Sequence, residues 1–537
     1  MDRREFLVAA AVAASARADQ TVPTVPTVPT VPSSSAHPAS DPIEELSLAD
    51  IASAFADGRL NSQQLTQSYL ARIGKLDRHG PNLRAVIETN PRALEIAASL
   101  DAERKSRGPR GPLHGVPILI KDNVETSDHM MSTAGSLALA GWYAPKDAPL
   151  VERLRAAGAV ILGKANLSEW ANFRSTHSLS GWSGRGGQCR NPYATDRTPS
   201  GSSSGSAVAV SSNLCAIAVG TETDGSIVSP ASINGIVGLK PTVGLVSRRG
   251  IVPISHSQDT AGPLTRSVHD AAVMLGVMSG LDADDAASAA VGDRFQTDYA
   301  RYVDQKGLTG ARLGIARKFF ADNAPLNEFL DTCITTLKSA GAVIVDPADL
   351  PMHGTTGAAE QEVLLYEFKA DLNAYLRRLP PAFPVRSLAA LIRFNDAHKD
   401  TEMPWFDQEL LRQAEAKGPL TEKAYRDARA ACLKATRSNG IDAVLAQHKL
   451  DAMVSLTSGP AWLIDTVNGD SDTGGCSSPA AIAGYPHLTV PAGLYRGVPI
   501  GLSFFGAAFS EPTLIKLGSG YEAVAHGRTP PRFLPGV

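Results

Sequence analysis

Short apolar runs that end in turn residues recur along the chain and alternate with stretches of helical periodicity. Runs of this length, rich in β-branched residues, are typical of buried strands, and strands that alternate with helices indicate a sheet covered by helices. We therefore expect an α/β fold with a largely buried sheet. The clearest runs lie within residues 115–124, 159–162, 215–219, 450–460, 486–493 and 498–506.

Helices are expected before the first of these runs and in a long region between the third and the fourth. Ser47 and Ser62 each precede an apolar periodicity, as the N-cap serine of a helix does. Residues from about 281 to 437 carry more charge, more helix-forming residues and fewer glycine turns than the rest of the chain. This stretch is expected to be mostly helical and to pack onto the sheet.

The composition indicates a large buried core and gives no sign of a polyanionic partner. Of the 537 residues, 43% are hydrophobic and 20% are charged, and the net charge is −3. A chain of this charge has no basic surface for nucleic acid or for an anionic membrane. We therefore expect neither as a partner.

The sequence contains no recognisable cofactor or metal motif. The five cysteines are scattered without a C-x-x-C pair, and the twelve histidines form no H-E-x-x-H or similar ligand spacing. The glycine patterns of P-loops and dinucleotide-binding turns are also missing. We expect the cysteines to be small buried side chains, and we expect no metal and no cofactor.

Residues 1–18 resemble an export signal. Arg3 and Arg4 precede a short apolar run, and the segment that starts at Ala16, Ala-Arg-Ala, has the spelling of a cleavage site. The paired arginines are similar to those of a twin-arginine signal, which exports folded proteins. A short helix of the fold itself is the alternative interpretation.

A proline-rich tract follows. Proline at every third position of TVPTVPTVPTVP forbids a helix and favours an extended polyproline II conformation. Residues 19–40 are therefore expected to be a disordered linker, with the folded domain over 41–537. No later run has the length and apolarity of a membrane span. The mature protein is expected to be soluble, without a membrane partner, and periplasmic or secreted in a bacterium.

Two residues with nucleophilic or basic side chains follow apolar runs. Lys121 ends one run, so its stem is expected to be buried, and burial disfavours a charged ammonium. A neutral lysine is a general base, whereas a lysine that extends from a strand end to solvent is structural only. Ser226 follows another run and a turn at Gly225, where backbone N–H groups can hold an oxyanion. A helix-capping serine is the alternative there.

The stretch TPSGSSSGSA, residues 198–207, allows three interpretations. By composition it is a flexible linker. By spacing, Gly201-x-Ser203-x-Gly205 matches the nucleophile elbow of an α/β-hydrolase, which would make Ser203 the nucleophile of an esterase. An elbow needs a strand that runs directly into the serine, but the residues before Ser203 are rich in turn formers. The third interpretation comes from a family resemblance.

Three segments together resemble the amidase signature family: GVPILIKDNV, TPSGSSSGSAVAV and GTETDGSIVSPASINGIVGLKPT. Further segments similar to its recurring ones are GKANLSEWANFRS, DTAGPLTRS, AGYPHLTVPAG and PIGLSFFG. The resemblance extends from about Leu46 to the C-terminus and is poor over about 281–437. It implies a single large domain with a mixed central β-sheet that helices cover on both faces.

The resemblance implies a Ser-Ser-Lys triad. Ser226 in its D-G-S turn would be the nucleophile, Ser202 on a cis peptide bond would relay the proton, and Lys121 would be the base. These roles agree with the chemistry, because a hydroxyl needs a base, a neutral lysine is one, and an intervening hydroxyl can both donate and accept a proton. The oxyanion hole would be formed by the backbone N–H groups of Thr223, Asp224, Gly225 and Ser226.

Two serines, Ser200 and Ser204, stand where the family usually has glycine. If either position needs a positive φ, a serine there costs strain. The resemblance also places the segment around residue 172 near the acyl pocket, although ordinary core aromatics are an equally good interpretation of its two rings. The implied substrate contacts are Trp170, Asn172, Phe173 and Ser203.

The leading hypothesis is an exported amidase that hydrolyses linear carboxylic amides through an acyl-enzyme. Its partner would be a small-molecule or peptide amide, and no oligomeric state is inferred. The spelling E-T-D-G-S resembles bacterial peptide amidases, which remove a C-terminal amide. The alternatives are the glutaminase subunit of a tRNA-dependent amidotransferase, an esterase that uses Ser203, and an inactive binding protein. The export signal and the missing basic surface disfavour the first, and the intact triad disfavours the last.

Overall fold

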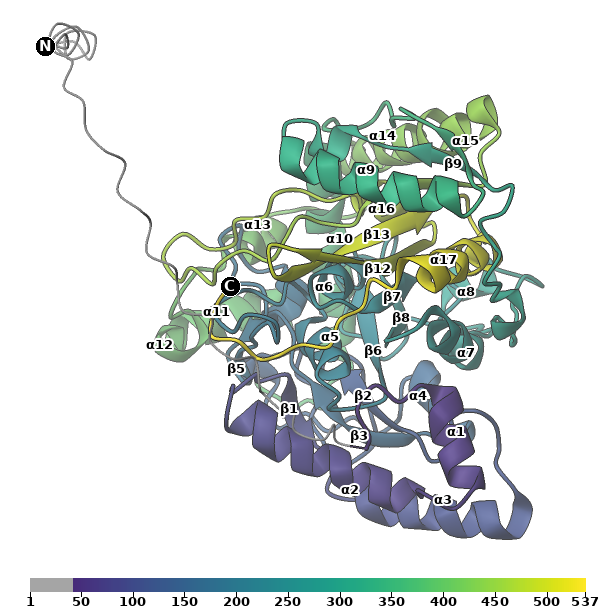
Figure 1. Ribbon diagram of the computed structural model, residues 1–537. Coiled ribbons are helices and arrows are strands. Elements are labelled where there is room, and N and C mark those ends of the chain that lie inside the picture. The colour runs from purple at the N-terminus through teal and green to yellow at the C-terminus, as the bar shows by residue number, and fades with distance from the viewer. Residues whose placement is uncertain (1–41) are drawn as a thin grey trace, which may run out of the picture. The chain divides into compact units, whose positions relative to one another are not determined.

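Eleven strands form one sheet through the centre of the computed structural model (Figure 1), which describes residues 42–537. Their order across the sheet is β1-β3-β2-β6-β8-β7-β12-β13-β11-β9-β10. The expected export signal and linker lie outside the described residues. The strands are β1 (Val86–Thr89), β2 (Pro117–Lys121), β3 (Val160–Ala165), β6 (Ile217–Glu222), β7 (Val237–Lys240), β8 (Thr260–Thr265), β9 (Arg312–Ile315), β10 (Val343–Val345), β11 (Ala452–Leu456), β12 (His487–Tyr495) and β13 (Val498–Phe505).

The sheet is mixed and covered on both faces. β2 runs parallel to β3 and β6, β9 runs parallel to β10 and β11, and the other neighbouring pairs are antiparallel. Every residue of β2, β3, β6 and β8 is buried. Because successive side chains of a strand point to opposite faces, both faces of the sheet are covered at these strands. The prediction of one α/β domain with a mixed, helix-covered sheet is therefore confirmed, and residues 43–537 form one unit.

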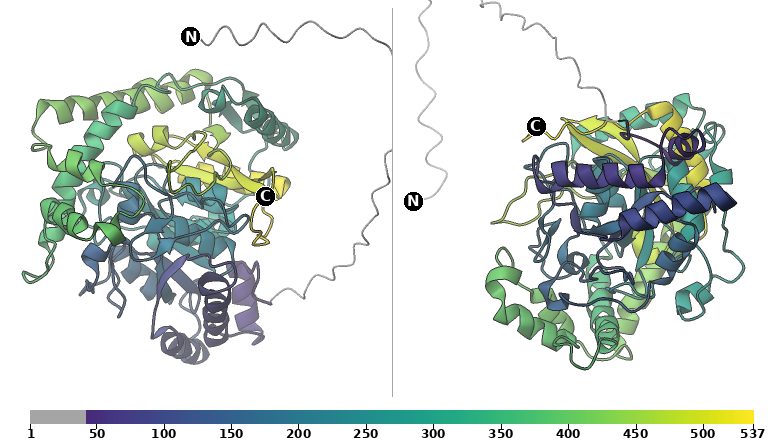
Figure 2. Two further views of the ribbon diagram at one scale, coloured as in Figure 1. Left: turned by 90° about the vertical axis from the view of Figure 1, so that its left-hand side faces the viewer. Right: turned by 90° about the horizontal axis from the view of Figure 1, so that it is seen from below.

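Helices on either side of the sheet supply its cover. α2 and α3 lie side by side (Figure 2). α2 contacts β2, α3 contacts β3, and α5 packs against β2 and β6. The longer helices are α1 (Leu48–Ala56), α2 (Ser62–Arg72), α3 (Ala93–Arg107), α4 (Pro149–Ala156), α5 (Ser204–Ser211), α7 (Val268–Met278), α9 (Ala324–Ser339), α10 (Gly357–Arg377), α11 (Leu388–Ala397), α14 (Lys423–Thr436) and α17 (Glu511–Ala525). The shorter ones are α6 (Val228–Ile233), α8 (Ala286–Ala289), α12 (Lys399–Glu402), α13 (Glu409–Glu415), α15 (Asp442–His448) and α16 (Ser478–Ala483).

One of the two expected serine caps is present and the other is wrong. The Ser47 hydroxyl accepts a hydrogen bond from the Asp50 N–H at 3.1 Å, which caps α1. For α2 the cap is Asn61, whose Oδ1 accepts from the Gln64 N–H at 2.8 Å. Ser62 is the first helical residue, and its hydroxyl donates to the Gly115 carbonyl at 2.7 Å. That bond joins α2 to the turn before β2.

The region from 281 to 437 contains helices α8 to α14, and it also adds β9 and β10 to the sheet. Sequence reasoning missed these two short strands. α10, α11 and α13 share a second hydrophobic cluster with loop residues that include Trp170 and Phe173, and the rings of Phe173 and Phe368 lie 5.0 Å apart. The region therefore packs against the loops at the carboxyl end of β3 as well as extending the sheet. No helix within residues 42–537 has the length and apolarity to cross a membrane.

Candidate active site

Lys121 is fully buried at the end of β2, where hydroxyl and carbonyl oxygens surround its amine. Its Nζ lies 2.8 Å from Ser202 Oγ and 3.0 Å from Ser203 Oγ. It also lies 2.9 Å from Thr221 Oγ1 and 3.2 Å from the Thr221 carbonyl oxygen. Thr221 belongs to β6, the parallel neighbour of β2, so the sheet itself brings these two residues together.

Burial lowers the pKa of Lys121 well below its ordinary value of 10.5. The carboxylates of Glu222 and Asp259 act in the opposite direction, but the desolvation of the ammonium outweighs them. No carboxylate hydrogen-bonds the Lys121 amine within the described residues. The expected neutral base is therefore favoured by its surroundings.

Ser202 lies in a loop that crowds against the loop after β3. The Gly201–Ser202 peptide bond is cis, and Ser202 is fully buried. The Ser168 N–H donates to the Ser202 carbonyl at 3.1 Å. A Cβ on Gly201 would lie 2.1 Å from Ser168 Oγ, so any larger residue would displace the Ser168 side chain. The two loops therefore fix the backbone on either side of the Ser202 hydroxyl.

The two serines that replace the family's glycines have different environments. Ser200 has a φ of 58°, the left-handed region in which a Cβ costs roughly 1–2 kcal/mol. Its hydroxyl lies 2.8 Å from Ser229 Oγ at the start of α6, a contact that glycine cannot make. Ser204 begins α5 at an ordinary φ, and its hydroxyl donates to the Ser200 carbonyl at 2.6 Å. The strain anticipated from the sequence thus falls on Ser200 alone.

Ser226 lies in the turn between β6 and α6, and Glu222 holds that turn. Glu222 is buried, and its carboxylate accepts from the N–H groups of Ile227 and Val228 at 2.7 and 3.1 Å. Gly225 has a φ of 78°, a conformation suited to glycine. The Ser203 N–H donates to the Ser226 carbonyl at 3.1 Å, which places the two serine loops side by side. Ser226 remains 8% exposed.

Four consecutive N–H groups in this turn have no acceptor among the described residues: those of Thr223, Asp224, Gly225 and Ser226. Buried backbone N–H groups are nearly always paired in folded proteins. A run of four free donors beside a serine is therefore the arrangement expected for binding an oxyanion.

A cavity of about 360 Å³ opens beside the two serine loops. Ser200, Gly201, Asp224 and Gly225 line one side of it, immediately before Ser202 and Ser226 in the chain. Asn172 lines it as well. Trp170 and Phe173 lie in the second hydrophobic cluster, and Ser203 is fully buried beside Lys121, so none of these three lines the cavity.

Another part of the cavity wall comes from a segment that sequence reasoning did not single out. It contains Thr457, Ser458, Trp462, Asp470, Asp472, Gly474, Gly475, Ser477 and Ser478. Asp470 accepts hydrogen bonds from the Ser180 N–H and the Trp462 indole at 2.9 and 3.0 Å, which fixes this wall to the loop after residue 173. The segment has no periodic pattern and no motif, so only the D-T-G-G turn after residue 471 could have indicated a binding loop.

The family model for amidases matches residues 64–515 of the chain. The chain belongs to the amidase family. A probable amidase of Arabidopsis thaliana is 44% identical over 501 residues, which are 92% of each protein. The solved structure of the peptide amidase from Stenotrophomonas maltophilia is 52% identical, has a TM-score of 0.88, and is matched over 92% of this chain and 99% of that one. The protein is thus an amidase, an enzyme that hydrolyses carboxylic amides.

The two enzymatic alternatives have weaker support. A glutamyl-tRNA(Gln) amidotransferase subunit from Pseudomonas aeruginosa is 33% identical over 508 residues, 91% of this amidase and 100% of that protein, and is the more distant relative. An esterase based on Ser203 disagrees with the structure. The Ser203 hydroxyl is fully buried and donates to the Thr221 carbonyl at 3.0 Å, and no strand of the large sheet runs into it.

Proposed function

We propose that this amidase acts through an acyl-enzyme at Ser226, with Ser202 and Lys121 as its proton relay, and that its substrates are the C-terminal amides of peptides. The observation that carries the first part is the fully buried Lys121 amine, 2.8 Å from Ser202 Oγ and beside the turn whose four N–H groups are free. Each step of the reaction can be assigned to one of these groups.

The hydrogen bonds around Lys121 match a neutral amine. Ser203 donates its proton to the Thr221 carbonyl, so its oxygen can only accept from the lysine. The Thr221 carbonyl can also only accept. These two acceptors can take the two N–H groups of a neutral amine, which leaves its lone pair to the hydroxyls of Ser202 and Thr221, 2.8 and 2.9 Å away. We assign the proton donor to Ser202, because its loop is the one that binds the Ser226 carbonyl through the Ser203 N–H.

The reaction follows from this arrangement. Ser226 Oγ attacks the amide carbon as its proton passes to Ser202 Oγ and the Ser202 proton passes to Lys121 Nζ. The free N–H groups of the turn stabilise the oxyanion. The relay then returns a proton to the leaving nitrogen, and ammonia departs to leave an ester on Ser226. Water attacks this ester by the reverse sequence and releases the carboxylic acid.

The cavity beside Ser226 supports a peptide amide as substrate. Three of its lining residues are aspartates, Asp224, Asp470 and Asp472, and none is a lysine or arginine. A free C-terminal carboxylate would be repelled there, whereas a neutral carboxamide would not. The same repulsion favours release of the product acid. Asn172 Oδ1 is buried without a partner among the described residues, and it offers an acceptor to a peptide N–H.

The triad is tested by substitutions measured on a peptide amide. Ser226→Ala should abolish ammonia release, because the nucleophile is lost. Ser202→Ala and Lys121→Met should lower kcat by roughly 10²–10⁴-fold, the range of general-base catalysis. Ser203→Ala is the matched control, since it removes a hydroxyl that also contacts Lys121 but stands outside the relay. Full activity in Ser226→Ala, or a loss confined to Ser203→Ala, would show that the assignment is wrong.

The substrate proposal is tested by kcat/KM for three peptide amides that differ only in the last residue: arginine, glutamine or glutamate. The order should be Arg > Gln > Glu, and Asp472→Asn should narrow the Arg/Glu ratio by about threefold to tenfold, since one charge pair near water contributes on the order of 1 kcal/mol. The narrowing should be smaller in high salt. Asp293→Asn, which makes the same charge change outside the cavity, is the control. A ratio that does not respond to Asp472→Asn contradicts the proposed role of the aspartates.

We also propose that the protein is exported by a twin-arginine system. The proposal is supported by the Arg3-Arg4 pair, by the apolar run after it, and by the Ala-Arg-Ala segment from Ala16, which resembles a signal-peptide cleavage site. In a bacterial host with that system, amidase activity should appear in the periplasmic fraction with a shortened N-terminus. Exchange of Arg3 and Arg4 for lysine should retain the activity in the cytoplasm, whereas Arg17→Lys should not. Unchanged fractionation of the paired-lysine variant would refute this route.

A further inference from the structure

Thr223, the first residue of the oxyanion turn, is held by a loop that follows it by more than thirty residues in the chain. Its hydroxyl donates to Asp259 Oδ1 at 2.6 Å, and its carbonyl accepts from Gln258 Nε2 at 3.3 Å. The other Asp259 oxygen accepts from the N–H groups of Ile254 and Ser255, both at 2.9 Å. Asp259 therefore fixes the shape of its own loop and the position of Thr223 at once.

The same loop is bound to one face of α10. Glu360, Glu367 and Asp371 are spaced by seven and four residues, so their carboxylates lie on one side of the helix. Glu360 accepts from Gln258 Nε2 at 2.9 Å. Glu367 Oε2 accepts from the hydroxyls of Ser255 and Ser257 at 2.5 and 2.8 Å. Asp371 accepts from the His256 N–H at 2.8 Å. Each residue from 255 to 258 is thus bound to an acid of α10.

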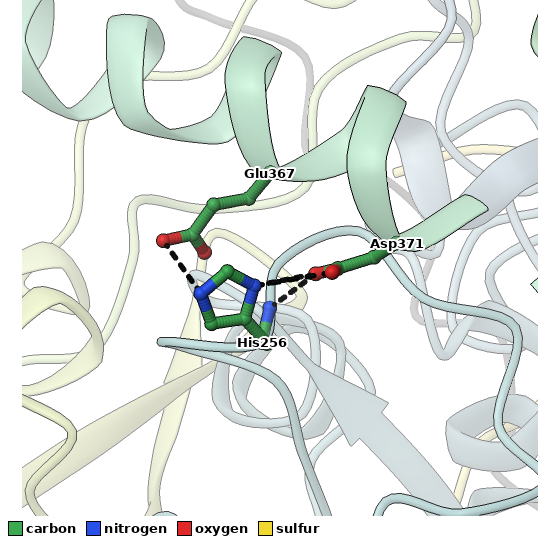
Figure 3. A group of neighbouring side chains, drawn as sticks. All are labelled: His256, Glu367 and Asp371. Carbon is green, nitrogen blue, oxygen red and sulfur yellow. Dashed lines mark hydrogen bonds and ion pairs between the residues drawn. The ribbon is translucent and has the colours of Figure 1, made fainter. Parts of the chain in front are cut away.

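The His256 ring lies between two of these acids (Figure 3). Its Nδ1 is 2.9 Å from Asp371 Oδ2, and its Nε2 is 3.4 Å from Glu367 Oε1. Burial alone would lower the pKa of His256, but the Asp371 and Glu367 carboxylates outweigh it and raise the pKa above its usual 6.5. We name His256, Glu367 and Asp371 the His256 clamp.

The clamp has the residue types of a metal site but not the geometry. The ligand atoms lie within 4.8 Å of one another. The two nitrogens, however, lie on opposite edges of the imidazole, and each faces a different carboxylate (Figure 3). An imidazole binds one metal ion through one nitrogen. An imidazolium with two ion-pair partners accounts for both contacts.

We propose that α10, through the His256 clamp and the loop 255–259, positions Thr223 and thereby aims the oxyanion N–H groups at the reacting carbonyl. His256 and Asp259 are then positioning residues for amide hydrolysis, because they act through Thr223 and contact no substrate. This inference rests on the proposed role of the turn from Thr223 to Ser226. It links the chemistry to a helix of the region 281–437, which supplies none of the triad residues.

A double-mutant cycle tests this coupling. His256→Ala should lower kcat by about tenfold to a hundredfold, as a misplaced oxyanion donor does, and should leave KM nearly unchanged. Thr223→Val removes the hydroxyl that donates to Asp259 and so breaks the contact through which the loop positions Thr223. In the Thr223→Val background, His256→Ala should lower kcat by less than about twofold, because the effects of two residues that act through one another are not additive. The affinity for a peptide aldehyde, whose adduct with Ser226 carries an oxyanion, should fall in parallel with kcat.

The controls separate this proposal from the alternatives. His269→Ala removes a similarly exposed histidine, 46% against 43%, which pairs with Asp270 at 3.2 Å on α7, and it should leave kcat unchanged. The positioning role would be overturned if His256→Ala lowered kcat equally in the wild-type and Thr223→Val backgrounds. A lower Tm with unchanged kcat and unchanged aldehyde affinity would overturn it as well. Loss of wild-type activity in a chelator, restored by Zn²⁺, would overturn it in favour of a metal site. Ser226→Ala, measured alongside, tests the proposed function separately.

Discussion

Burial of the Lys121 amine among oxygen atoms without a carboxylate partner is the constraint on which the rest of the site depends. Two other lysines at strand ends, Lys164 and Lys240, are equally buried, and burial lowers the pKa of each to about 8. Asp122 opposes the shift at Lys164, and Glu222 opposes it at Lys240. All three amines contact only hydroxyl or carbonyl oxygens, and carboxylates also oppose the shift at Lys121. What sets Lys121 apart from the other two lysines is its contact with the Ser202 hydroxyl, whose loop lies beside the turn that holds Ser226.

The fold provides this environment through strand pairing. Because β2 and β6 are parallel neighbours, Lys121 and Thr221 leave the sheet at the same edge, and the turn with Ser226 begins directly after β6. The loop with Ser202 reaches the same edge ahead of α5, which packs against both strands. Three segments that are distant in sequence therefore meet at one point: the end of β2, the loop with Ser202, and the end of β6 with its turn. α10 adds a fourth through the loop 255–259.

The sequence predicts which helix, strand or turn carries a side chain more accurately than it predicts the contacts of that side chain. Lys121 and Ser226 could be singled out because an apolar run precedes each, and Ser202 could be singled out from the family segments. The role of Thr221 beside Lys121 could not be found, since it depends on the register of two strands about a hundred residues apart. The cap of α2 was assigned one residue too late because Ser62 is also a good cap type, yet its hydroxyl is used by Gly115. β9 and β10 were missed because their runs are short and lie among helices.

The central claim is that Lys121 is neutral in the folded enzyme at neutral pH. Nitrogen NMR of protein labelled with ¹⁵Nζ-lysine measures this directly, with Lys121→Met used to assign the signal and to separate it from Lys164 and Lys240. We expect a neutral-amine shift for Lys121 at pH 7, and we expect kcat/KM to fall as the pH drops through the pKa at which that signal titrates, because a protonated lysine cannot accept the relayed proton. An ammonium shift for Lys121 in fully active enzyme at pH 7 would contradict the account.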